Sequence, residues 1–149
     1  MKELLRRLLR HVPGLGARAG APLSAKSAAG RRGENAAAAH LKRHGYRVLE
    51  RTFTTRRGEV DIVAFRDGVL AFVEVRSQTE PALIDPLATV TRRKQLRVIK
   101  AAQAYCAARG LPQDDVALRF DLITVLFSDG RQPDVKHVEN AFGGTRKTF

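Results

Sequence analysis

Two acidic residues, Asp61 and Glu74, are the residues of this chain whose types and spacing best fit catalytic chemistry. The dipeptide Asp67-Gly68 favours a two-residue hairpin turn between two strands rich in apolar residues. Counting outward from that turn places Asp61 directly opposite Glu74. Because like charges at paired positions repel each other, something positive is expected between them. The pattern therefore predicts a divalent cation held by the two carboxylates.

A hard cation such as Mg²⁺ or Mn²⁺ takes oxygen ligands, keeps several waters and is commonly held by one or two carboxylates together with substrate phosphate. Asp61, Glu74 and the backbone carbonyl of Val75 would supply part of such a shell. The cation could polarise a phosphoryl oxygen and lower the pKa of bound water. The alternative is a structural network in which Arg76 neutralises the acids, since structural ion pairs perturb charges as functional ones do.

The elements that must position this hairpin follow from the surrounding sequence. Both faces of the hairpin are largely apolar, which is typical of strands in the middle of a covered sheet. A helix between the third and fourth strands allows them to pair in parallel through a right-handed crossover. The order is helix, three strands, helix, strand, and it predicts an α/β fold with a mixed sheet flanked by helices. The expected ranges are a helix over 34–44, a strand over 46–54, the hairpin over 58–77, a helix over 85–108, a strand over 117–127 and a short edge strand over 135–138.

The domain organisation is predicted as residues 1–29 for an N-terminal extension, 30–142 for the folded domain and 143–149 for a basic C-terminal tail. The first twelve residues combine basic side chains with an amphipathic leucine stripe, which could lie on an anionic membrane or on nucleic acid. Residues 13–27 are rich in Gly, Ala, Pro and Ser and are predicted to form a flexible linker. The stripe consists of Leu4, Leu5, Leu8 and Leu9.

The charge balance indicates a polyanionic partner. Twenty-seven Lys and Arg residues face 15 Asp and Glu residues in the 149-residue chain, giving a formal net charge of +12. Nucleic acid is the leading candidate, and a membrane or ribosomal surface is the competitor. The single cysteine, Cys106, cannot form an internal disulfide, so a cytoplasmic location is expected. No apolar run is long enough to span a membrane, and the four histidines show no zinc-ligand spacing.

A helix whose charged residues are all basic supplies the expected contacts to nucleic acid. No acidic residue occurs between Asp85 and Asp114, and phosphate contacts would relieve the repulsion among the basic side chains. A solvated basic helix face is the plain alternative. The candidate nucleic-acid-binding residues on this helix are Arg92, Arg93, Lys94, Arg97 and Lys100.

Several stretches together resemble the YraN family of small bacterial proteins, which are usually described as candidate endonucleases. They are GRRGENAAAAHLKRHGYRVLERTF, RRGEVDIVAF, LAFVEVRSQ, the helix with Lys94, and RFDLITV, and they span about Gly30 to Phe142. That family is similar to the PD-(D/E)XK nuclease superfamily. The resemblance implies a restriction-endonuclease-like core in which a helix, three strands, a helix and a strand follow one another, in agreement with the order derived above.

The resemblance assigns roles to individual residues. It implies that Asp61 is the metal-binding aspartate and Glu74 the second acid, with Glu34 as an additional metal-site acid. For Glu34 the alternative is a carboxylate in the first turn of a helix, where the macrodipole stabilises it. Gln78 lies near where superfamily members often place a polar contact to substrate.

Arg76 departs from the superfamily pattern, which has lysine at this position. Lysine can lose a proton when buried, whereas arginine keeps its charge in proteins. Arg76 could grip a phosphate or stabilise the transition state, but activation of water would then fall to the metal or to Lys94. The alternative for Lys94 is one more solvated charge on a basic face.

Arg119 and Asp121 lie on one face of the fourth strand and match the family's Arg-Phe-Asp element. We interpret them as a structural ion pair or an anchor for the first helix rather than as catalytic residues.

Two functions follow from the sequence. The first is a Mg²⁺- or Mn²⁺-dependent endonuclease that acts on DNA rather than RNA and selects it by structure, for repair or recombination. The second is a nucleic-acid-binding protein of the same fold whose chemistry is weak or lost. Because related resolvases often work as dimers, the resemblance leaves a homodimer open.

Overall fold

The computed structural model describes residues 2–10, 26–81, 84–111 and 116–143. Its centre is a five-stranded mixed sheet in the order β1-β2-β3-β4-β5, in which only β3 and β4 pair in parallel. The predicted α/β fold, with a restriction-endonuclease-like core, is confirmed. The elements are α1 (Lys2–Leu9), α2 (Ala28–Arg43), β1 (Arg47–Thr54), β2 (Glu59–Arg66), β3 (Val69–Thr79), the 3₁₀-helix η1 (Pro86–Thr89), α3 (Arg92–Ala108), β4 (Ala117–Phe127) and β5 (Asp134–Phe142).

The hairpin between β2 and β3 has the predicted register. Arg66 pairs with Val69, and the pairing continues to Ile62 opposite Val73. Asp67 and Gly68 both have positive φ, 50° and 78°, as a two-residue turn of type I′ requires. The turn chemistry alone therefore brings the strand segments with Asp61 and Glu74 side by side.

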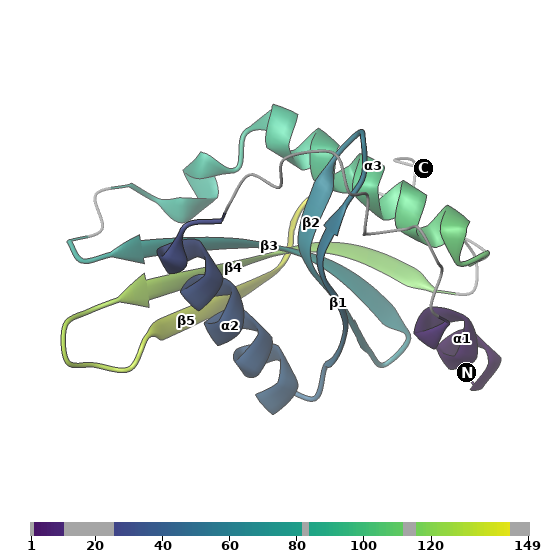
Figure 1. The fold of residues 1–149 in the computed structure, drawn as a ribbon, viewed down its shortest axis with the longest axis horizontal. Coiled ribbons are helices and arrows are strands. Elements are labelled where there is room, and N and C mark those ends of the chain that lie inside the picture. The colour runs from purple at the N-terminus through teal and green to yellow at the C-terminus, as the bar shows by residue number, and fades with distance from the viewer. Residues whose placement is uncertain (1, 11–25, 82–83, 112–115, 144–149) are drawn as a thin grey trace.

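Two helices cover the two faces of the sheet, so that the layers run α3, sheet, α2 (Figure 1). Side chains that alternate along β3 divide between two cores: Leu70 and Phe72 pack on the α3 side, and Ala71 and Val73 pack on the α2 side. Glu74 follows Phe72 in this alternation and therefore belongs to the α3 face. The opposite face, under α2, is lined by smaller side chains.

Three elements differ most from the sequence prediction. The predicted helix over 85–108 is two pieces, because the Thr91 hydroxyl accepts from the Lys94 N–H and caps a new helix after η1. Helix α2 begins at Ala28, capped by Ser27, rather than at Glu34. Strand β5 extends beyond the predicted 135–138 because its ladder with β4 continues, across a register shift, to Phe142.

The leucine stripe of the N-terminal segment packs on the protein's own core. Leu4 and Leu8 are buried in the core on the α3 side, and Arg7 donates to the carbonyl of Gly110 after α3. The expectation that this stripe lies on a membrane or on nucleic acid is wrong for these two leucines, because an apolar surface within the domain already covers them. The predicted linker over 13–27 lies mostly outside the described residues, as does all but the first residue of the tail over 143–149.

Within the described ranges, we find no helix that combines the length and the apolar character needed to cross a membrane.

Candidate functional site

The candidate site lies where β2 and β3 separate. Their backbone pairing ends at Ile62 and Val73. One position further, the carboxylate of Asp61 takes over the role of a strand partner, because its Oδ2 accepts a hydrogen bond from the Val75 N–H at 2.8 Å. A side chain thus replaces a backbone carbonyl as the acceptor. This substitution fixes the carboxylate of Asp61 beside Glu74 and Val75, the three residues that the sequence places together.

Glu74 is the most perturbed acid near this point. It is only 1% exposed, and its Oε1 lies 3.2 Å from Lys94 Nζ and 3.7 Å from Arg76 Nε. Its Oε2 is buried and has no hydrogen-bond partner among the described residues. Burial, followed by the negative charge of Asp61, raises the pKa of Glu74 to about 7, although Lys94 and Arg76 act in the opposite direction. Glu74 therefore has one oxygen available for a ligand.

Glu34 joins the site because of a glycine in α2. A Cβ on Gly33 would lie 2.7 Å from the Cβ of Ser77, so only glycine lets α2 approach β3 this closely. Glu34 follows directly and is buried, and its Oε1 accepts from Arg51 Nε and from the Thr52 hydroxyl, both at 3.2 Å. Since α2 starts at Ala28, Glu34 is in the second turn of the helix, and the first-turn macrodipole explanation for it is wrong.

Lys26 is the site residue that sequence reasoning missed. Its ammonium lies between two acids, bonded to a carboxylate oxygen of Glu34 and to Asp61 Oδ1 at 2.9 Å, with the Thr52 hydroxyl at 3.4 Å. Burial by itself would lower the pKa of Lys26, but Asp61 and Glu34 outweigh it and the pKa is raised. The only signal in the sequence was one lysine in a stretch of small residues, which identifies no partner.

Lys94 and Arg76 both lie at Glu74. The side chain of Lys94 turns inward from α3 and also approaches Glu59, with 3.9 Å between Nζ and Oε1. Its alternative as a solvated charge is therefore wrong. Arg76 is held from the other side, because its Nη2 donates to the carbonyl of Thr89 at 3.2 Å. The separation of η1 and α3 thus places the Thr89 carbonyl at Arg76 and the ammonium of Lys94 at Glu74.

The other predicted nucleic-acid contacts remain on the outside. Arg92, Arg93, Arg97 and Lys100 are exposed on α3. Gln78 lies further along β3, where its amide donates to the carbonyl of Ile84 at 2.9 Å. The structure therefore joins Glu34 to Asp61 through Lys26 and places Arg76 and Lys94 at the neighbouring Glu74, and it leaves Gln78 outside these contacts. These exposed basic side chains lie along α3, next to the candidate site.

The residues at the splayed strands fit a hard divalent cation in part. No three His, Cys, Asp or Glu side chains in the described ranges are grouped closely enough to form a metal cage. The donors present are carboxylate oxygens and a backbone carbonyl, which is the chemistry that Mg²⁺ and Mn²⁺ prefer, and the unpartnered Oε2 of Glu74 is one of them. Such a site would leave coordination positions for water and for a phosphate oxygen.

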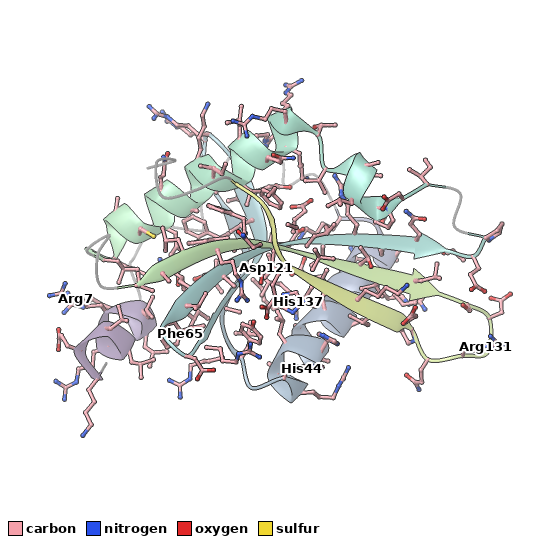
Figure 2. All side chains as sticks on the ribbon, turned by 180° about the vertical axis from the view of Figure 1, so that it is seen from behind. Arg7, His44, Phe65, Asp121, Arg131 and His137 are labelled. Atoms are coloured by element: carbon pink, nitrogen blue, oxygen red, sulfur yellow. The ribbon has the colours of Figure 1, made fainter. Side chains whose placement is uncertain are left out.

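A second polar cluster lies on the face of the sheet opposite Glu74, under α2 (Figure 2). Asp121 is fully buried and accepts from Arg119 Nε at 2.8 Å and Nη2 at 2.9 Å, and it lies 2.8 Å from His137 Nε2. Arg119 also donates to the Tyr46 hydroxyl at 2.6 Å. Both oxygens of Asp121 have partners, in contrast to Glu74. The prediction of a structural ion pair at this position agrees with these contacts.

Comparison with known proteins places the chain in a large group of bacterial relatives. The model of the "Uncharacterised protein family UPF0102" matches residues 33–125. A UPF0102 protein of Trichlorobacter lovleyi is 46% identical over 116 residues, covering 77% of this chain and 90% of the relative. Another, of Anaeromyxobacter dehalogenans, is 46% identical over 127 residues, covering 85% and 92%. A third, of Geobacter metallireducens, is 44% identical over 114 residues, covering 76% and 90%.

Proposed function

We propose that this chain, which belongs to the uncharacterised protein family UPF0102, is a metal-dependent endonuclease that hydrolyses phosphodiester bonds in DNA. The observation that supports the proposal most is Glu74. A buried carboxylate with an unpartnered oxygen and a second acid beside it is costly to keep, and such costs concentrate at functional sites. The YraN resemblance, confirmed at the level of the family, points to the same chemistry.

Asp61, Glu74 and the carbonyl of Val75 would hold a divalent cation, with Glu34 as an additional acid. When bound, the cation would polarise a phosphoryl oxygen and lower the pKa of a water molecule. Arg76 would offset negative charge on the phosphate from its position at Glu74. Lys94 places a second positive charge at the same carboxylate and orients it.

A cationic surface next to these acids supports nucleic acid as the substrate. A Cβ on Gly58 would lie 1.8 Å from the backbone carbonyl oxygen of Arg97, so the turn between β1 and β2 lies directly on α3. The Thr55 hydroxyl fixes that turn through contacts with the Arg57 N–H, the Gly58 N–H and the Gly58 carbonyl. Arg56 and Arg57 are exposed in this turn, beside the basic side chains of α3.

Removing this pair of arginines should weaken DNA binding at every sequence tested. With Arg56→Ala and Arg57→Ala together, we expect the slope of log affinity against log salt concentration to fall by about 1 to 2, since each phosphate contact contributes about 0.9. Titration of labelled DNA at several salt concentrations measures the slope. The control is the double variant Lys42→Ala with Arg43→Ala, which removes two exposed basic residues at the C-terminal end of α2. An equal loss in both double variants would mean that the surface is not specific.

Metal-dependent cleavage tests the proposed activity itself. Purified protein should cut at least one of duplex, single-stranded, flapped or branched DNA in Mg²⁺ or Mn²⁺, and chelator should abolish cutting. Among the described residues no zinc-binding cluster occurs, and the sequence offers no recognition helix, so we expect selection by DNA structure. Absence of cutting on all four substrates in both metals would contradict the proposal.

The competing function is a nucleic-acid-binding protein without efficient chemistry. Arg76 favours it, because the superfamily pattern has a lysine there and an arginine is a poor base. DNA binding that persists without metal, combined with no cleavage, would support this function. It would also leave the cationic surface intact as the functional part of the molecule.

A further inference from the structure

Lys26 makes an unusual set of contacts for a residue at the start of a helix. It directly precedes Ser27, the N-cap of α2, and its side chain reaches Glu34 on α2, Thr52 on β1 and Asp61 on β2. Oxygen atoms of three separate elements thus surround one ammonium group. Lys26 is a charge that joins the helix to the two strands at the edge of the candidate site.

The groups around this ammonium have the chemistry of a hard-cation site. Two carboxylates and a hydroxyl bind it, and oxygen donors of these types also bind Mg²⁺ and Mn²⁺. Asp61 is shared, because one of its oxygens accepts from Val75 and the other from Lys26. Neither oxygen of Asp61 is therefore without a partner, whereas Oε2 of neighbouring Glu74 is.

Two positive charges cannot share Asp61 and Glu34 without strong repulsion. A divalent cation bound to these acids would lie next to the ammonium, in a partly buried place where charges are poorly screened. The ammonium of Lys26 can move into solvent, because about a quarter of the side chain is exposed and its flexible stem can rotate without movement of α2.

We propose that Lys26 is a built-in counter-cation of this site, which must leave Asp61 and Glu34 before a divalent cation binds there. The proposal depends on the proposed function, because it assumes that these acids bind metal. Lys26 neutralises the acids in the metal-free protein and in this way limits metal affinity. Once displaced, its ammonium is free to contact a phosphate of the substrate, so bound nucleic acid would favour metal binding.

Calorimetric titration of Mn²⁺ into the full chain tests this directly. Lys26→Met should bind Mn²⁺ about tenfold more tightly than the unmodified chain, within the usual range of coupling between two ligands. Lys26→Arg keeps the charge and should not tighten binding. Lys42→Met, which removes an exposed lysine from α2, should leave the affinity unchanged.

The outcomes separate this inference from the proposed function. Mn²⁺ binding that is equal or weaker in Lys26→Met overturns the role of Lys26 and leaves the metal site standing. If neither the unmodified chain nor Lys26→Met binds Mn²⁺, the metal site itself is wrong and the inference fails with it. Thermal unfolding with and without Mn²⁺ checks that each variant folds, and Lys26→Gln replaces the methionine variant should that one fail to fold.

Discussion

Glu74→Gln should raise the free energy of unfolding at pH 8 by on the order of 3 kcal/mol while removing metal-dependent cleavage. The stability figure follows from the pKa of Glu74, which is raised from 4.5 to about 7, at about 1.4 kcal/mol for each pKa unit. Glutamine has nearly the same shape but no charge, so it removes the cost of a buried carboxylate. A residue that lowers stability and is needed for activity is expected at a catalytic site.

The direction of the pH dependence follows from the raised pKa. Below pH 4.5 Glu74 is protonated in both the folded and the unfolded chain, and the two proteins should be nearly equally stable. As the pH rises from 4.5 to about 7, the unfolded chain ionises Glu74 while the folded chain keeps its proton, so the stability of the unmodified protein falls relative to Glu74→Gln; above about pH 7 the difference levels off. Urea unfolding of both proteins between pH 5 and 8 measures this difference, and titrating groups that do not interact with residue 74 contribute equally to both.

The loss of cleavage should be large. If Glu74 is a direct metal ligand as proposed, its removal should slow cleavage by at least about 100-fold, which is the upper end of the effect of losing a group that only supports a ligand. The matched control is Glu80→Gln, an exposed acid just past the end of the same strand, which changes the net charge equally. A Glu74→Gln variant that is less stable at pH 8, or that still cuts DNA, would contradict the role given to this acid.

The hairpin that carries the acids could be predicted because its determinants are local. Asp67-Gly68 accepts positive φ at both positions, and the register follows from counting residues outward. The apolar run over 117–127 likewise predicts β4 with the observed bounds. Patterns with a period of two, bounded by turn residues, need no information about distant parts of the chain.

Arg76 is a local partner of the acids, but the more distant partners could not be predicted from local patterns, because they come from far along the chain. Lys26 lies 35 positions before Asp61, in a segment whose composition indicates a linker. Lys94 belongs to a run of basic residues, and the sequence alone does not tell which of these side chains turns toward the acids. Its direction depends on where α3 begins, and Thr91 sets that start by capping the helix. Local patterns therefore predicted the strands and the candidate acids, while tertiary contacts determine the charges around them.

The second large effect concerns Asp121, on the face of the sheet opposite Glu74. Asp121→Ala should lower the free energy of unfolding at pH 7 by about 3–5 kcal/mol, the usual cost of removing one partner from a buried ion pair. Asp121 has no exposed surface, and it accepts hydrogen bonds from Arg119 and from the backbone N–H of Asn140. Alanine would leave the Arg119 guanidinium partly buried and without that carboxylate. Urea unfolding measures the loss, and Asp134→Ala, an exposed acid on β5, should change stability by less than about 0.5 kcal/mol.

The pH dependence of this loss distinguishes an ion pair from simple packing. Burial by itself would raise the pKa of Asp121, but the hydrogen bonds from His137, Arg119 and Asn140 outweigh it and the pKa lies below its ordinary value of 3.8. A lowered pKa stabilises the folded chain above pH 3.8, and this contribution is lost as the pH falls through the folded value. The difference between the unmodified chain and Asp121→Ala should therefore shrink in strong acid. A difference that stays constant from pH 7 into strong acid would mean that Asp121 stabilises the fold by its volume and not by its charge.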